Sequence, residues 1–203
     1  FWVDDGFTLT HALLPTDDFF RVIADQEMNG ALYTTLMHGW VRLGQSEAWV
    51  RLPAVLFMTA AVPLLFVLGR RLFDERVAVL ATFLFAINAY VVAFSHEGRT
   101  YAFTLLLALA SVTLLVRFVD GPTRPRWWAW VAVSGLLPHA HFFGTLVIAA
   151  EAVPLLARGR LPTPKRGLLK GFAAIALLAL PIAAFLAAGG DKGQGGTGPP
   201  LSP

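Results

Sequence analysis

The sequence predicts an all-α protein: a polytopic bundle of transmembrane helices, with interfacial amphipathic helices in a first extracytoplasmic loop. Of its 203 residues, 56% are hydrophobic and only 14% are charged, which is far more apolar than an ordinary soluble domain. Long apolar runs alternate with short basic clusters, as in membrane proteins with several helical spans. There is no cysteine, which excludes disulfides and thiolate chemistry. Because the basic residues cluster between apolar runs, we expect the lipid bilayer as a partner and no nucleic acid.

Residues 1–46 are predicted to form the extracytoplasmic loop. Thr16 or Asp17 can cap a short amphipathic helix, and Asn29-Gly30 marks a second break. Residues 31–43 repeat apolar side chains at helical spacing but are too few to cross about 30 Å of hydrocarbon. We therefore expect this helix to lie in the membrane interface. Its expected polar face carries Thr34, Thr35, His38 and Arg42.

Residues 47–188 are predicted to form the transmembrane bundle, with about six spans. The apolar segments are 52–68, 77–94, 101–119, 127–137, 142–157 and 168–188. Pro138 is expected to end or bend the fourth. Residues 189–203, rich in glycine and proline, are expected to be a flexible extracytoplasmic segment. Both chain ends look cut, so we expect a fragment that lacks the first helix of a longer protein.

Lysine and arginine are divided unevenly between the two sides of such a bundle. If the joints alternate sides, five fall on one side and eleven on the other, namely Arg70, Arg71, Arg76, Arg117, Arg124, Arg126, Arg158, Arg160, Lys165, Arg166 and Lys170. The positive-inside rule makes the richer side cytoplasmic, in a multi-pass protein of the plasma membrane. Tryptophans are expected at the interfaces, at positions 40, 49, 127, 128 and 130.

Three polar clusters then fall on the extracytoplasmic face: Asp4-Asp5, residues 95–101 and residues 139–141. A carboxylate costs several kcal/mol at a bilayer centre, so the acidic pair is expected to face water. One hypothesis is that Asp4 or Asp5 is a catalytic base. The alternative is the solvated end of a loop.

The second and third clusters could form a substrate pocket. Arg99 can grip a phosphate with two parallel hydrogen bonds, and Tyr101 can add a hydroxyl donor. Arg99 could instead pair with Glu97 or extend to the headgroups. His139 and His141 could bind a divalent cation if carboxylates approach, but no third ligand is evident. We therefore assign no metal and no cofactor, and expect these histidines either to shape the pocket or to belong to a plain interfacial joint.

An acid lies within an apolar segment at Glu151. Such a residue costs roughly 2.5–3.5 kcal/mol on insertion scales, so it should be protonated, paired or facing a wet cavity. A proton-coupled transporter would use it, whereas structural pairing inside the bundle is the simpler interpretation.

Three segments in order resemble a known pattern: Ser46–Pro53, Gly69–Phe73 and His96–Ala102. Together they resemble polytopic glycosyltransferases of the GT-C class, in particular the dolichyl-phosphate-mannose-protein mannosyltransferase-like family, which includes the bacterial lipid A aminoarabinose transferases. The resemblance covers about residues 1–160. No single motif decides it; the order and spacing together are specific.

The family's first extracytoplasmic loop opens with Trp-x-Asp-Glu, and Trp2-Val3-Asp4-Asp5 is similar. The resemblance therefore implies Asp4 as the catalytic base, with Asp5 in place of the usual Glu. A His-Pro-Pro-Leu-Tyr-like stretch corresponds to Asn29–Tyr33, which keeps Leu32 and Tyr33 but lacks the His and both Pro.

Further along, Glu97, Arg99 and Tyr101 match a Glu-x-Arg-x-Tyr segment, and His139–Gly144 resembles a Thr-His-x-Phe-Gly joint. The resemblance implies that Arg99 and Tyr101 bind the donor phosphate. The expected substrate pocket adds Tyr33, His96, Glu97, His139 and His141.

The activity implied by the resemblance is transfer of a sugar, such as mannose, from a polyprenyl-phosphate donor to a hydroxyl of a protein, glycan or lipid. The reaction inverts the anomeric carbon on the extracytoplasmic face. Two rivals remain: a transporter or flippase of lipid-linked sugars, and a non-catalytic membrane subunit.

Overall fold

The computed structural model describes residues 3–25, 28–156 and 165–188. All regular secondary structure in these residues is helix, which confirms the predicted all-α class. The helices are α1 Val3–Ala12, α2 Thr16–Asp25, α3 Ala31–Trp40, α4 Glu47–Leu72, α5 Glu75–Ala86, α6 Ala89–Ser95, α7 Tyr101–Asp120, α8 Arg124–Ala140, α9 Gly144–Leu156 and α10 Lys165–Ala187.

Among the described helices, α4, α7 and α10 are long and apolar enough to cross a membrane. The pair α5 and α6 would make a fourth span, bent by 59°. This bend corrects the expectation of one continuous segment over 77–94. The Asn88 side chain accepts hydrogen bonds from the backbone N–H groups of Tyr90 and Val91, so it starts a new helix where α5 ends.

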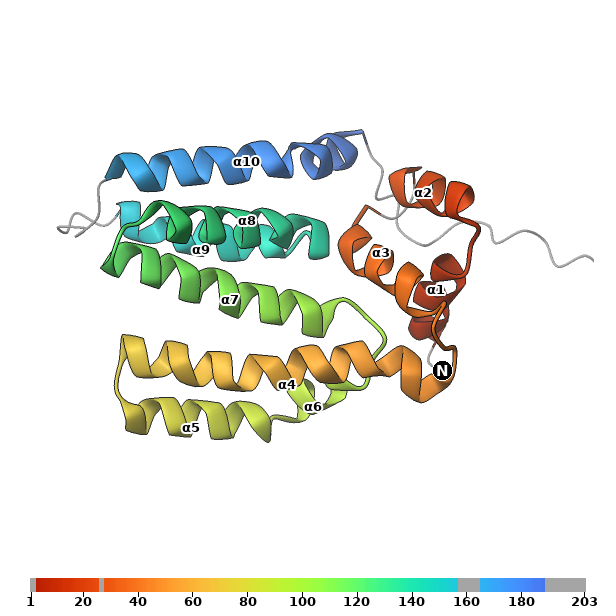
Figure 1. Cartoon of the computed structure of the whole chain (residues 1–203), viewed down its shortest axis with the longest axis horizontal. Coiled ribbons are helices and arrows are strands. Elements are labelled where there is room, and N and C mark those ends of the chain that lie inside the picture. Colours follow the sequence, from red (N-terminus) through yellow and green to blue (C-terminus); the bar gives the residue numbers. More distant parts are fainter. Residues whose placement is uncertain (1–2, 26–27, 157–164, 189–203) are drawn as a thin grey trace, which may run out of the picture.

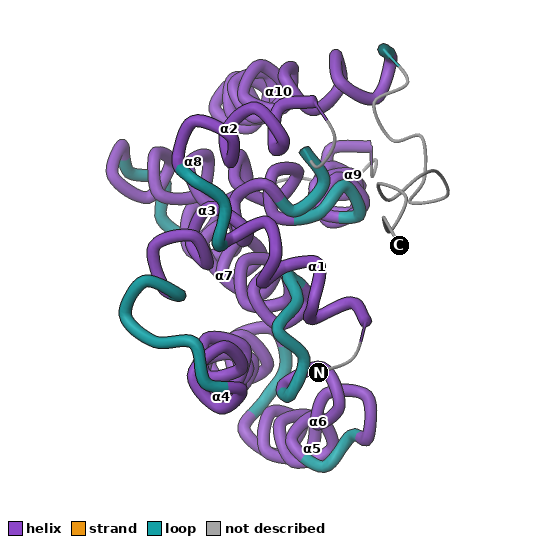
Figure 2. The backbone as a smooth tube through the Cα atoms, turned by 90° about the vertical axis from the view of Figure 1, so that its right-hand side faces the viewer, coloured by secondary structure: helices purple, strands orange, loops and turns teal. Residues whose placement is uncertain are grey.

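The long helices pack side by side in the order α5, α4, α7, α8 and α10, with α9 against α8 and α7 (Figure 1). The helices α1, α2 and α3 gather at one end of this bundle (Figure 1), and Figure 2 looks at the molecule from that end. We call this the loop end; it also holds the joints at residues 96–100 and 141–143. The opposite end, where α4 meets α5 and α7 meets α8, is called the basic end.

The loop-end helices form a packed layer of their own. Ala12, Tyr33, Met37, Val41 and Val50 are buried together between α1, α3 and α4. No helix was predicted over residues 3–12, but they form α1. Their helix, α1, is stabilised by packing against α3 rather than by its own sequence pattern.

The expected polar face of the α3 segment is wrong in part, because Thr34 and His38 are buried. The His38 ring stacks on Phe19 of α2 at 4.1 Å between centroids. Its Nδ1–H donates to the carbonyl of Ala12 at 2.8 Å, and its Nε2 accepts from the Arg42 guanidinium at 2.8 Å. Covered by α1 and α2, this face of α3 packs against protein instead of facing water.

The turn between α3 and α4 is held by two tryptophans. The rings of Trp40 and Trp49 stack at 4.6 Å, and each indole N–H donates to the other residue's carbonyl, at 2.9 and 3.2 Å. The Ser46 side chain accepts from the Trp49 N–H and caps α4. The Ser46–Pro53 segment therefore fixes where the first long helix leaves the loop end.

The centre of the bundle contains a buried polar network. Glu151 of α9 accepts hydrogen bonds from the Ser111 hydroxyl of α7 and from the Trp130 indole N–H of α8, and Ser111 also bonds Ser134 at 2.6 Å. All four side chains are buried. This arrangement matches the structural interpretation of Glu151. It also corrects the interfacial placement of Trp130, which is fully buried because its N–H has an acceptor inside the bundle.

Replacing Glu151 with alanine is expected to lower the free energy of unfolding by about 1–3 kcal/mol. It removes the acceptor of Ser111 and Trp130 in a low-dielectric interior and leaves a cavity. Glu151→Gln keeps an acceptor oxygen and should lose less. Thermal unfolding in detergent, followed by Trp fluorescence, measures both. Equal stability of the alanine variant and the parent would contradict a structural role.

Candidate functional site

Two joints of the bundle are bound together at the loop end. The Thr100 hydroxyl, just before α7, donates to the carbonyl of Ala140 at the end of α8, at 2.7 Å. Thr100 and Ala140 are both buried. Pro138 was expected to end or bend the fourth segment; it lies inside α8, which continues to Ala140. The extended backbone of His141 then ends the helix, so His141 leaves α8 beside the start of α7.

The turn at Asn29-Gly30 docks onto these joints. The backbone N–H of Phe142 donates to Asn29 Oδ1 at 3.0 Å. Gly30 has a φ of 90°, a left-handed conformation that glycine adopts without strain. A Cβ at this position would lie 3.8 Å from the Ala140 carbonyl oxygen and 3.9 Å from Thr100 Cγ2. The loop layer is thus anchored where α7 begins and α8 ends.

Arg99, Tyr101 and His141 form a cluster at this anchor. The Arg99 guanidinium lies 5.6 Å from the centroid of the Tyr101 ring, within cation–π distance. The Tyr101 ring lies 6.0 Å from the His141 ring and 5.0 Å from Phe94. All three members of the cluster are partly exposed. They therefore combine one cation, one phenol and one imidazole, all of which can bind an anion that carries a polar group.

The neighbours of His141 determine which of its ring nitrogens carries the proton. The backbone N–H of Phe143 donates to Nδ1 at 3.2 Å, so Nδ1 is the acceptor and the neutral ring carries its proton on Nε2. Partial burial, and secondarily the nearby positive charge of Arg99, hold the pKa of His141 below its usual value. Neutral His141 can thus donate from Nε2 without adding a second charge beside Arg99.

This low pKa predicts a pH effect on stability. Unfolded His141 takes up a proton near its ordinary pKa of about 6.5, whereas the folded ring resists it, so stability falls as pH drops below that value. Above it, the residue contributes no pH dependence. The loss of Tm between pH 7 and pH 5.5 should therefore be smaller in His141→Asn than in the parent. An identical loss in both proteins would contradict this.

The other predicted pocket residues lie in different surroundings. His96 is exposed and ends α6, with Nδ1 2.7 Å from the Val92 carbonyl. Tyr33 is buried in the layer beside Phe103, 6.2 Å between ring centroids. His139 Nε2 lies 2.9 Å from the Leu178 carbonyl of α10, so this ring faces α10 while His141 faces Tyr101. Glu97 is partly buried two residues before Arg99.

The acidic pair, Asp4 and Asp5, falls in the first turn of α1. Their side chains lie outside the described part of the structure, so their distance to Arg99 stays untested. The backbone of α1 belongs to the loop-end layer, which lies at the same end of the bundle as the cluster (Figure 1). Within the described residues, no three His, Asp or Glu side chains are grouped as metal ligands would be.

A comparison of the sequence with family models identifies a match over residues 31–187, to the family described as dolichyl-phosphate-mannose-protein mannosyltransferase. The chain belongs to this family. It is therefore a membrane glycosyltransferase in the general sense, with helices suited to span a bilayer. No curated protein and no solved structure matches it.

Within this mannosyltransferase family member, sequence reasoning missed two residues that position the site. Thr100 and Asn29 join the loop layer, α7 and α8 by hydrogen bonds. Asn29-Gly30 opens the stretch in which the resemblance led us to expect a His and two Pro, and the pair anchors the layer there. The Asn-Gly dipeptide was a turn signal in the sequence, but its docking partner lies 113 residues away and could not be inferred.

Proposed function

We propose that this mannosyltransferase family member moves a hexose from a polyprenyl-phosphate donor to a hydroxyl group of a protein, glycan or lipid acceptor. The observation that carries the proposal is the cluster of Arg99, Tyr101 and His141 at the loop end. The phosphate of a lipid-linked sugar lies at the membrane surface, which is where the membrane-spanning helices end and where this cluster lies. The site would face the extracytoplasmic side, because lysines and arginines gather at the opposite end.

In the proposed reaction, the acceptor oxygen forms a bond to the anomeric carbon from the face opposite the phosphate. The bond between that carbon and the phosphate oxygen breaks, and its electron pair stays on the phosphate. The acceptor's proton passes to the Asp4 carboxylate, which Asp5 helps to orient. The product is inverted at the anomeric carbon, and polyprenyl phosphate remains in the membrane.

Arg99 is proposed to stabilise the charge that grows on the leaving phosphate, with hydrogen bonds from the Tyr101 hydroxyl and His141 Nε2. Donors placed before the reaction cost no reorganisation as charge develops, which makes such stabilisation a large catalytic term. A single phosphate carries less charge than the diphosphate of a nucleotide sugar. We therefore propose that these side chains suffice without a metal or other cofactor.

The transporter rival rested on Glu151. That carboxyl group is buried and bonded by Ser111 and Trp130, so it forms part of the contact between α7, α8 and α9. This arrangement supports packing of the helices and gives the transporter hypothesis no specific observation in its favour.

The test uses the full-length protein in liposomes that contain a radiolabelled mannosyl polyprenyl phosphate and a set of hydroxyl acceptors. We expect labelled product from the lipid-linked donor, none from a nucleotide sugar, and no change when a chelator is added. Movement of labelled donor across the bilayer without product would favour the transporter. Neither product nor movement would favour the non-catalytic subunit.

A further inference from the structure

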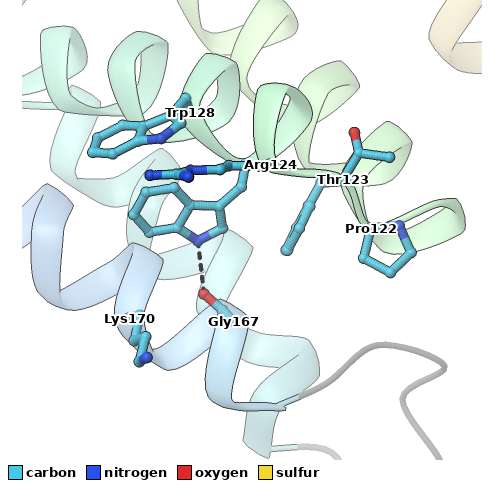
Figure 3. A pocket seen from close by; sticks show the side chains of 8 residues that line it. Pro122, Thr123, Arg124, Trp128, Gly167 and Lys170 are labelled. Atoms are coloured by element: carbon cyan, nitrogen blue, oxygen red, sulfur yellow. Dashed lines mark hydrogen bonds between the residues drawn. The ribbon is translucent and has the colours of Figure 1, made fainter.

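The basic end of the bundle has a depression of its own, far from the candidate active site. It lies between the start of α8 and the start of α10 and has a volume of about 470 Å³. Arg124, Lys170, Trp127 and Trp128 are among the side chains that line it (Figure 3). The indole N–H of Trp127 donates to the Gly167 carbonyl at 2.9 Å, which ties α8 to α10 at the floor of the depression.

Two other arginines at this end have partners within the chain. Arg71 of α4 forms an ion pair with Asp120 at the end of α7. The Arg126 guanidinium donates to the carbonyls of Gly121 and Arg117, at 2.9 and 3.2 Å, and so caps α7. Asp74, a further acid here, caps α5 through the Val77 N–H. These contacts serve the fold, and the two cations that line the depression take no part in them.

Arg124 and Lys170 form no ion pair with any carboxylate in the described part of the chain. The start of α8 adds further positive potential. Thr123 makes no capping hydrogen bond with its side chain, and the first turn of α8 contains no acid. A helix N-terminus carries a partial positive charge that is normally offset by an acid or an anion. Two side-chain cations and this helix end therefore border one depression, and no described acid offsets their charge.

The aromatic lining indicates a lipid rather than a free anion. Trp127 and Trp128 pack edge to face at 4.7 Å, and Trp128 is 54% exposed. Exposed indoles beside cations at the end of membrane-spanning helices are typical of the headgroup region. From the depression, exposed leucines continue along α10 at Leu169, Leu177 and Leu180, where acyl chains could lie.

We propose that this depression binds an anionic phospholipid, with the lipid phosphate beside Arg124 at the start of α8, Lys170 on the α10 side of the headgroup, and the acyl chains along α10. Basic pockets between membrane helices bind phosphate-bearing headgroups in this way. We call it the lipid site. The bound lipid would neutralise the charges at the α8 and α10 starts and hold the two helices at a fixed depth.

The test is native mass spectrometry of the full-length protein in detergent, titrated with phosphatidylglycerol or with phosphatidylcholine of the same acyl chains. We expect the parent to retain phosphatidylglycerol preferentially. The double variant Arg124→Gln/Lys170→Gln should lose most of that retention, by about tenfold. The control Arg70→Gln/Arg76→Gln removes two exposed cations from the same end, outside the lipid site, and should retain phosphatidylglycerol like the parent.

Equal loss in both double variants would mean a diffuse charge effect and would overturn the proposal, as would equal retention of the two lipids by the parent. Displacement of phosphatidylglycerol by millimolar inorganic phosphate would assign the depression to a free anion instead. Arg124→Lys/Lys170→Arg keeps both charges and should retain the lipid. If the glutamine variant does not fold, quenching of tryptophan fluorescence by brominated phosphatidylglycerol, stronger in the parent than in Trp128→Phe, decides the question.

Discussion

Replacing Arg99 with alanine is expected to lower kcat/KM for the lipid-linked donor by about 10²–10³-fold, the cost of removing one preorganised donor to a developing negative charge. Arg99 is the cation of the loop-end cluster, held over Tyr101 and close enough to His141 to affect its pKa. Arg99→Lys keeps the charge but loses the planar fork that binds two phosphate oxygens, so its loss should be intermediate. Initial rates at varied donor concentration measure both.

The matched control is Arg21→Ala. Arg21 lies on α2 at the same end, is exposed, and pairs with Asp18 on its own helix at 3.6 Å. It should change kcat/KM less than twofold, since an exposed pair of this kind contributes little. Similar losses for Arg99→Ala and Arg21→Ala would mean that general surface charge attracts the donor, and Arg99 would have no specific role at the phosphate.

Replacing Asp4 with asparagine is expected to lower kcat by about 10²–10⁴-fold, the usual contribution of a general base. Asparagine preserves the shape of the side chain but cannot accept the acceptor's proton. Its backbone lies in the first turn of α1, at the loop end of the bundle. KM for the donor should change little, since Asp4 is proposed to act on the acceptor.

Substitutions of two other acids serve as comparisons for Asp4→Asn. Asp5→Asn should cost less than Asp4→Asn, because Asp5 is proposed only to orient its neighbour. Asp17→Asn changes an exposed acid in the first turn of α2 and should leave kcat at the level of the parent. Turnover near that of the parent in Asp4→Asn would remove Asp4 as the base. A larger loss in Asp5→Asn would exchange the two roles.

The effects of Arg99 and Asp4 differ in the kinetic parameter that they change. Arg99 is proposed to bind the group shared by the donor and the transition state, so KM and kcat should both respond. Asp4 is proposed to take a proton only as the acceptor attacks, so its effect should appear in kcat. Measuring kcat and KM separately therefore distinguishes a residue that binds phosphate from one that acts as a base, without a structure of the bound substrate.

The sequence by itself determined the helical membrane class and the position of each long helix within a few residues, and it placed Arg99 and Tyr101 at the start of one of them. Apolar length and the spacing of charges are local properties that a single chain displays directly. Asn88 was an exception: its capping power was not recognised inside an apolar run, and the resulting break at residues 87–88 was missed.

The tertiary structure decided which polar residues meet. His38 and Trp130 were expected at surfaces, but each is buried because a hydrogen-bonding partner from a distant helix satisfies its polar group. Likewise, His139 and His141 are two residues apart and face different helices, since α8 ends between them. Such outcomes depend on contacts between segments far apart in the chain, and no local pattern in the sequence encodes those contacts.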